Sequence, residues 1–110
     1  MIPQLPAAHL KAWLAAQAGQ AVVLDVREPW ELQTASVRPD GFELIAIPLG
    51  ELASRFGELP AQACVACLCH HGVRSQHAAA FLDRQGIAAV NLQGGIDAWS
   101  CELDPSVARY

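Results

Sequence analysis

The sequence predicts an α/β fold in which a central, mostly parallel sheet of four to five strands carries helices on both faces. Two observations support this prediction. Short apolar runs alternate along the chain with helix-like, amphipathic segments. These runs are apolar at successive positions rather than at every second one, which is typical of parallel strands that are covered on both faces. In such sheets, ligands bind at the carboxyl ends of the strands.

The first predicted helix and strand lie near the N-terminus. Leu10, Trp13 and Leu14 fall at i, i+3 and i+4 in an alanine-rich stretch, which predicts an amphipathic helix. We expect this helix to end at Gly19, because glycine readily adopts the conformation that closes a helix. The run AVVLDV (21–26) is rich in β-branched residues and apolar up to its aspartate, which predicts a buried strand.

A short helix, a loop and a second strand follow. In REPWELQ (27–33), the proline is well placed for the first turn of a helix. The Pro-Asp-Gly sequence at residues 39–41 predicts a turn within a loop. ELIAIP (43–48) predicts a second buried strand that its proline ends. The segment GELASRFGELP (50–60) places its apolar residues on one helical face and therefore predicts another helix.

The last third of the chain continues the alternation. ACVACLC (63–69) and IAAVNL (87–92) are apolar runs that predict the third and fourth strands. Between them, residues 74–85 form an amphipathic pattern that ends before Gly86, which predicts a helix. GGIDAWS (94–100) predicts a short final helix.

Composition limits the classes of function. The 110 residues are expected to form a single domain over residues 1–110, because a second hydrophobic core would not fit. A formal net charge of −4, with only seven Lys and Arg residues, argues against a nucleic-acid partner. No run approaches the ~18 apolar residues that a membrane-spanning helix needs, so no membrane association is expected.

The cysteines suggest a reducing compartment. Cys64, Cys67 and Cys69 fall within six residues of one predicted strand, and Cys101 stands alone. This is poor spacing for a disulfide framework, and the N-terminus lacks the basic start of a signal peptide. We therefore expect the protein to be cytoplasmic.

The stretch CLCHHGVRS (67–75) crowds two cysteines, two histidines and an arginine together. A metal site is not expected, because Cys64 points away from the face that Cys67 and Cys69 share, and no second ligand pair exists. A redox pair is not expected either. Along an extended strand, Cys67 and Cys69 would have Cα atoms ~6.5–7 Å apart, at the limit of disulfide geometry. Cys64 and Cys67 are instead expected to be small core residues.

An activated thiol explains the stretch best. Residues 70–73 form a tight loop into the helix that begins near Arg74, and Gly72 permits a backbone conformation closed to other residues. Successive backbone N–H groups in such a loop, together with the helix N-terminus, bind anions. A thiolate of Cys69 at the rim would be stabilised by these dipoles and by Arg74.

Four segments of the chain carry a resemblance to a known family: LDVREPWE (24–31), IPLGEL (47–52), CHHGVRS (69–75) and NLQGGIDAW (91–99). In their order and spacing, over essentially the whole chain, they resemble a single-domain rhodanese, a sulfurtransferase of the thiosulfate type. The resemblance implies a rhodanese-like fold. It also implies that Cys69 is the nucleophile, which takes the outer sulfur of thiosulfate or another donor as a persulfide. Cyanide or a thiol then accepts this sulfur.

The resemblance also assigns residues and partners. The residues expected to surround the transferred sulfur and the departing anion are His70, His71, Gly72, Val73, Arg74 and Ser75. The expected partners are small sulfur-containing anions, thiol acceptors and a sulfur-accepting protein, and no cofactor or metal is implied. The six residues from Cys69 to Arg74 favour sulfur over the tetrahedral oxyanion that the longer loop of phosphatase relatives holds.

Several alternatives stay open in the sequence. The imidazoles of His70 and His71 either tune the thiol or simply project from the loop. Asp25 and Arg27, at the carboxyl end of their strand, either position Arg74 or the loop, or form a structural ion pair. The same reactive thiol would also serve a protein-fed persulfide carrier or a sensor of sulfide or oxidants that turns over little small-molecule substrate.

Overall fold

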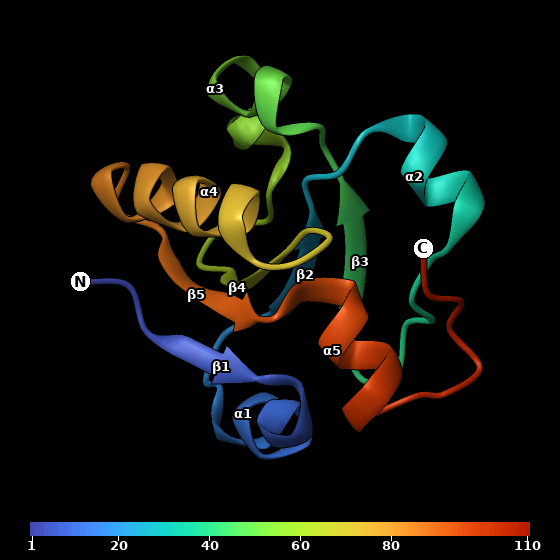
Figure 1. The fold of residues 1–110 in the computed structure, drawn as a ribbon. Helices are drawn as coiled ribbons and strands as arrows, with labels where there is room; N and C mark the ends of the chain where they lie inside the picture. Colours follow the sequence, from blue (N-terminus) through green and yellow to red (C-terminus); the bar gives the residue numbers. More distant parts are fainter.

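The computed structural model describes residues 1–110 and contains one five-stranded sheet, in which every neighbouring pair of strands is parallel. The strands are β1 (Gln4–Pro6), β2 (Ala21–Asp25), β3 (Glu43–Ala46), β4 (Cys64–Leu68) and β5 (Ala88–Gln93). Their order across the sheet is β1-β5-β4-β2-β3, so β4 lies at the centre (Figure 1). The predicted α/β class with a parallel sheet is confirmed.

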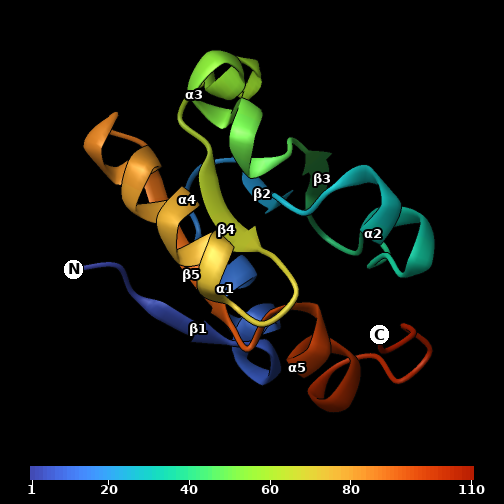
Figure 2. The same cartoon turned by 45° about the horizontal axis from the view of Figure 1, so that its top comes forward.

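Helices cover both faces of this sheet, as the sequence predicts (Figures 1 and 2). They are α1 (Leu10–Ala16), α2 (Pro29–Thr34), α3 (Leu52–Arg55), α4 (Val73–Arg84) and α5 (Gly95–Glu102). Residues of α3 and α4 share one buried cluster with the sheet, and residues of α1 and α5 share the other. None of these helices is long and apolar enough to cross a membrane.

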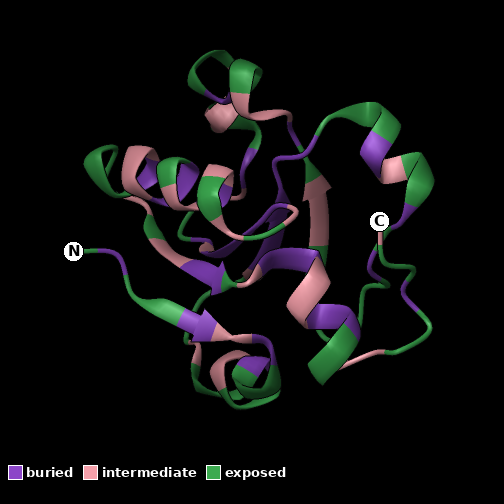
Figure 3. Cartoon of the chain, in the orientation of Figure 1, coloured by how far each residue is buried: buried purple, intermediate pink, exposed green.

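The central strand β4 supplies side chains to both clusters. Val65 and Cys67 pack toward α3 and α4, as does Cys69 just after the strand, whereas Ala66 and Leu68 pack toward α1 and α5. This alternation follows from the two-residue period of a strand. Figure 3 shows that burial is concentrated along β2 and β4. Because both faces are covered, the strand reads as a continuous apolar run in the sequence.

The sheet differs from the prediction at its two edges. β1 was not expected, because it has only three residues and one of them is a proline. Residues 43–48 were predicted to be a buried strand, but β3 is only half buried because it pairs with β2 alone. The segment 50–60 is also not one helix: the four-residue α3 lies between two 3₁₀ turns.

Two side chains are more exposed than a core residue would be. Trp30 on α2 is 62% exposed. Cys64 is half buried, since it opens the strand at the amino edge of the sheet. Cys67 is buried as expected, and the Trp99 side chain of α5 is buried too.

The carboxyl edge of the sheet gathers the loops that carry the sequence motifs. Asp25 at the end of β2 is in register with Leu68 at the end of β4, so the chain turns at neighbouring points. The turn into α5 passes directly beneath the Cys69 loop, where the Ile96 N–H donates to the Cys69 carbonyl at 2.8 Å. A Cβ at Gly95, where φ is +62°, would collide with the Cys69 and His70 carbonyls, so only glycine allows this approach.

Candidate active site

Cys69 is the first residue after β4, and its side chain is 1% exposed. Its Sγ accepts a hydrogen bond from the Gly72 N–H at 3.0 Å and lies 3.1 Å from the Ser75 Oγ. Gly72 makes the first contact possible, because its φ of +104° lies in a region that other residues rarely adopt. The sulfur therefore sits inside the turn that leads into α4.

The N-terminal end of α4 offers unused donors next to this sulfur. The N–H groups of Val73, Arg74 and Ser75 donate to no acceptor in the protein. The first N–H groups of a helix have no partner within the helix, and they carry the positive end of its dipole. The Cys69 Sγ and an anion bound beside it are thus placed where negative charge is favoured.

Arg74 does not contact Cys69 but pairs with Glu31 of α2. Its two terminal nitrogens donate to the two carboxylate oxygens, each at 2.7 Å. Glu31 is buried, and it also accepts the Glu28 N–H at 2.9 Å. The Arg74 guanidinium, followed by these other donors, lowers the pKa of Glu31 to about 2. Glu31 in turn raises the pKa of Arg74. The charges of the pair are therefore fixed and opposite.

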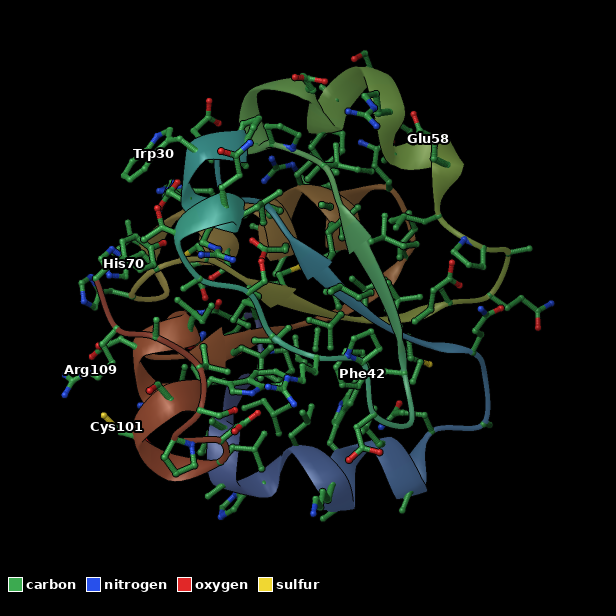
Figure 4. The ribbon with its side chains drawn as sticks, turned by 90° about the vertical axis from the view of Figure 1, so that its right-hand side faces the viewer. Trp30, Phe42, Glu58, His70, Cys101 and Arg109 are labelled. Carbon is green, nitrogen blue, oxygen red and sulfur yellow. The ribbon has the colours of Figure 1, made fainter.

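Tyr110 connects the Cys69 loop to this ion pair. Its ring stacks on the His70 imidazole with centroids 3.9 Å apart and an interplanar angle of 6°. Its carbonyl lies 2.7 Å from the His70 Nε2, and its hydroxyl donates to Glu31 at 2.8 Å. Burial raises the pKa of Tyr110, so the hydroxyl keeps the proton that it donates. His70 and Trp30 project from the same side of the molecule (Figure 4).

Asp25 and Arg27 form a buried ion pair, one of the two alternatives that the sequence leaves open. Their closest atoms are 2.7 Å apart, and both side chains are buried. Arg27 also donates to the Ala35 carbonyl at 2.8 Å and to the Tyr110 hydroxyl at 3.0 Å. Neither residue forms a hydrogen bond or an ion pair with Arg74. The pair reaches the loop only indirectly, through Tyr110 and Glu31.

A polar network behind Cys69 fixes the direction of the Ser75 hydroxyl. The Asn91 amide group reaches the Gly72 carbonyl at 3.1 Å, and this carbonyl can only accept. The Asn91 nitrogen must therefore face Gly72, and the Asn91 oxygen faces Ser75 at 2.6 Å. Ser75 consequently donates its proton to Asn91. Toward Cys69 it presents a lone pair, which can accept a hydrogen bond only from the thiol form of the cysteine.

The other cysteines and histidines are placed apart from this network. All four thiols are free. Burial, and then the proximity of Cys69, raises the pKa of Cys67 to about 12, so this thiol is unreactive. His71 stacks on His70 and is exposed, as are His77 and Cys101. No three His, Cys, Asp or Glu side chains come together in a way that could hold a metal ion.

Three residues of this site were missed in the sequence. Asn91 carries a signal, because it is the one polar residue in the run IAAVNL. Glu31 lies within a recognised segment, but only the fold shows that it pairs with Arg74, which is 43 positions away. Tyr110 lies outside every motif, and nothing in the sequence indicates its contact with His70.

A family model described as the rhodanese-like domain matches residues 7–102. A sulfurtransferase from Allochromatium vinosum is 36% identical over 88 residues, which cover 79% of this chain and 78% of that protein. The probable adenylyltransferase/sulfurtransferase MoeZ of Mycobacterium tuberculosis is 35% identical over 104 residues. This match covers 93% of the chain, which spans only about a quarter (26%) of MoeZ.

The fold is also similar to that of solved structures. A rhodanese-related protein from Thermoplasma volcanium is 35% identical and superposes with a TM-score of 0.79. The match covers 98% of this chain and 99% of that one. The sequence relatives support sulfur transfer as the general activity of such domains.

Proposed function

Because the chain belongs to the rhodanese-like domain family, we propose that residues 1–110 form a sulfurtransferase domain that works through a persulfide on Cys69. One observation carries this proposal. The Cys69 Sγ accepts a hydrogen bond from the Gly72 N–H just before the N-terminus of α4, beside three N–H groups that have no acceptor in the protein. A thiolate, a bound anion and a terminal persulfide sulfur all carry negative charge that this helix end stabilises.

The reaction proceeds in two half-reactions. The Cys69 thiolate attacks the outer sulfur of a donor such as thiosulfate, a new S–S bond forms, and sulfite leaves with the electron pair of the broken bond. An acceptor thiolate or cyanide then attacks the terminal sulfur, and the Cys69 thiolate leaves in its turn. This covalent route predicts ping-pong kinetics and needs no cofactor.

The residues of the loop are assigned to binding. The backbone N–H groups of His70, His71, Gly72, Val73, Arg74 and Ser75 surround the transferred sulfur and the leaving anion. Asp25 and Arg27 support the loop indirectly, through Tyr110 and Glu31. The acceptors are small thiols or a sulfur-accepting protein. The four free cysteines suit the reducing cytoplasm as the working compartment.

The test is the intact mass of the protein after brief exposure to thiosulfate, followed by addition of cyanide. We expect the gain of one sulfur atom, its loss to cyanide as thiocyanate, and no gain in Cys69→Ser. Repeated turnover identifies an enzyme, whereas a domain that loads once and keeps its sulfur is a protein-fed carrier. A folded protein with a free Cys69 that no sulfane sulfur donor loads would refute the proposal.

A further inference from the structure

We propose that Tyr110 is a positioning residue for sulfur transfer, which holds both ends of the Cys69 loop (residues 69–75) in the arrangement that receives the transferred sulfur. The inference rests on the proposed function, and it adds a residue to that site. Tyr110 lies beyond residue 102, where the match to the family model ends, so the family match assigns it no role.

The backbone donors around the Cys69 sulfur are held in two different ways. The N–H groups of residues 73–75 belong to the first turn of α4, so the helix itself fixes their direction. The N–H groups of His70 and His71 also donate to no acceptor in the protein, but they lie in the turn before the helix. The direction of these two N–H groups therefore depends on the contacts that hold His70.

The backbone of His70 is held by α5, and its side chain is held by Tyr110. The Ile96 N–H donates to the Cys69 carbonyl at 2.8 Å, and the Asp97 N–H donates to the His70 carbonyl at 3.2 Å. The Tyr110 ring stacks on the His70 imidazole with centroids 3.9 Å apart, and the Tyr110 carbonyl lies 2.7 Å from the His70 Nε2. Figure 4 shows His70 beside the end of the C-terminal segment. Without Tyr110, only the α5 contacts would hold this part of the loop.

The Tyr110 hydroxyl holds the other end of the loop through Glu31. It donates to the Glu31 Oε1 at 2.8 Å and accepts from the Arg27 Nη1 at 3.0 Å. Glu31 in turn binds both terminal nitrogens of Arg74, each at 2.7 Å. Burial raises the pKa of Tyr110, so the hydroxyl keeps the proton that it donates. One side chain thus contacts both His70 and the partner of Arg74.

The C-terminal segment 103–110 is itself anchored to α5. The Ser100 hydroxyl donates to the Val107 carbonyl at 2.7 Å, and the Val107 side chain is buried in the core. Arg109 is paired with Asp97 at 2.9 Å. The ring at the end of this segment is therefore placed by several contacts upstream of it, as a positioning role requires.

The size of the effect follows from the contacts that remain without the ring. Donors stabilise developing negative charge best when they already point at it, and a displacement of about 1 Å can cost about 100-fold in rate. Removal of the Tyr110 ring leaves the α5 contacts in place, so the N–H groups of His70 and His71 are loosened rather than lost. We expect sulfur loading of Cys69 to slow by about tenfold.

The experiment is a double-mutant cycle on Tyr110 and His70. Its readout is the second-order rate constant with which thiosulfate loads Cys69, measured by rapid quenching and intact mass with Cys69→Ser as the blank. Tyr110→Leu and His70→Leu should each slow loading by about tenfold, because each removes the stack. In the His70→Leu background, Tyr110→Leu should slow loading by no more than about threefold, the part that the hydroxyl contributes.

Tyr110→Phe is the conservative variant. It keeps the ring on His70 and removes only the hydroxyl, so loading should recover to within about threefold of the wild type. A second readout needs no activity. The stacked Tyr110 ring shields the His70 imidazole protons, so their NMR signals should move downfield in Tyr110→Leu and stay in Tyr110→Phe. The absence of these signals from His70→Leu assigns them.

Phe56→Leu is the matched control. It removes one ring of an aromatic pair, Phe56 and Phe81, whose centroids are 5.4 Å apart. Phe56 lines a hollow together with Cys64, at the start of β4, whereas the Cys69 loop follows the other end of that strand. Phe56→Leu should leave the His70 signals in place and the loading rate within about twofold of the wild type.

The positioning role and the function on which it rests fail in different ways. If a folded Tyr110→Leu, checked by its circular dichroism, loads as fast as Phe56→Leu, the positioning role is wrong and the sulfurtransferase function stands. The same conclusion follows if Tyr110→Leu slows loading equally with and without His70. If Tyr110→Leu does not fold, His70→Leu decides alone, and a wild-type loading rate in it refutes the role. If no sulfane sulfur donor loads the wild type, the proposed function is wrong and the role falls with it.

Discussion

Cys67 and Cys69 are two residues apart on one face of the same strand path, yet their surroundings differ completely. Cys67 lies in the middle of the sheet, among apolar side chains, and burial raises its pKa to about 12. Cys69 is equally buried, but its Sγ has the Gly72 N–H and the Ser75 hydroxyl within 3.1 Å. Low exposure is common to both, so exposure does not distinguish the thiol that we propose to be reactive from its neighbour in the core.

The difference arises from the backbone rather than from neighbouring charged side chains. One more pair of residues carries the chain out of the sheet and into the turn before α4, where N–H groups lack partners. Arg74 is turned toward Glu31 and supplies no direct contact to either sulfur. The position that we propose to be reactive is thus the one at the end of the strand, where open α/β sheets bind their ligands.

The largest expected effect is a direct contrast in alkylation. In a protein with Cys64→Ser and Cys101→Ser, iodoacetamide at pH 8 should modify Cys69 and leave Cys67 unmodified. With a pKa of about 12, Cys67 is a thiolate in only about one molecule in 10⁴ at this pH. Peptide mapping after timed quenching measures the ratio. Comparable labelling of the two thiols in the folded protein would show that Cys69 is no more reactive than Cys67.

The next effect concerns stability in acid. The pKa of Glu31 is about 2 in the folded protein and near 4.5 when unpaired, so its carboxylate stabilises the fold above pH 4.5. This contribution, about 3 kcal/mol, is lost as the pH falls from 4.5 toward 2. Urea unfolding at several pH values should therefore show the wild type losing more stability than Glu31→Gln over this range. Parallel losses in the two proteins would mean that the pair with Arg74 does not hold in solution.

Gly72→Ala should disturb Cys69 and spare Cys67. The substitution forces a side chain into a φ of +104° and places its Cβ 3.2 Å from the Gly94 nitrogen, so the turn must move. We expect sulfur loading of Cys69 to fall by about tenfold or more, as the N–H contact to Sγ is lost. Gly57→Ala is the control, because nothing lies within 4 Å of its added Cβ. Equal loading rates in the two variants would show that the conformation of the Gly72 turn does not affect sulfur loading of Cys69.

The smallest effect tests the direction of the Ser75 proton. Asn91→Leu removes the acceptor of the Ser75 hydroxyl, which then becomes free to donate to the Cys69 sulfur. The pH midpoint of Cys69 alkylation should move downward by about one pH unit or less, since one hydrogen bond contributes about 1 kcal/mol.

Ser75→Ala supplies the control for this prediction. In the Ser75→Ala background, Asn91→Leu should leave the midpoint where it is, because the hydroxyl that transmits the effect is gone. A shift that persists without the hydroxyl would show that Asn91 acts through the position of the loop instead. Labelling of Cys67 should not change in any of these variants.

Sequence patterns predicted the sheet better than its edges and the thiol better than its partners. The buried strands β2 and β4 can be recognised in the sequence because burial on both faces requires an unbroken run of apolar residues. β1 is too short to form a pattern, and β3 has the same residue types as a buried strand while lying at an edge. The loop after β4 could be predicted because its residues are contiguous in the sequence. The roles of Glu31, Asn91 and Tyr110 could not be predicted, since they depend on contacts between distant parts of the chain.

The contacts that complete the Cys69 surroundings have a consequence for the order of folding. The Asn91 amide donates a hydrogen bond to Gln4, which is 87 positions away in the sequence, and Glu31 accepts one from Tyr110, which is 79 positions away. Closing such long loops costs entropy that only a largely formed core can offset, so these contacts form late. During folding, the Cys69 sulfur therefore obtains its local Gly72 contact early and its full polar surroundings last. A nascent chain would carry a thiol whose reactivity matures only when both distant segments have docked.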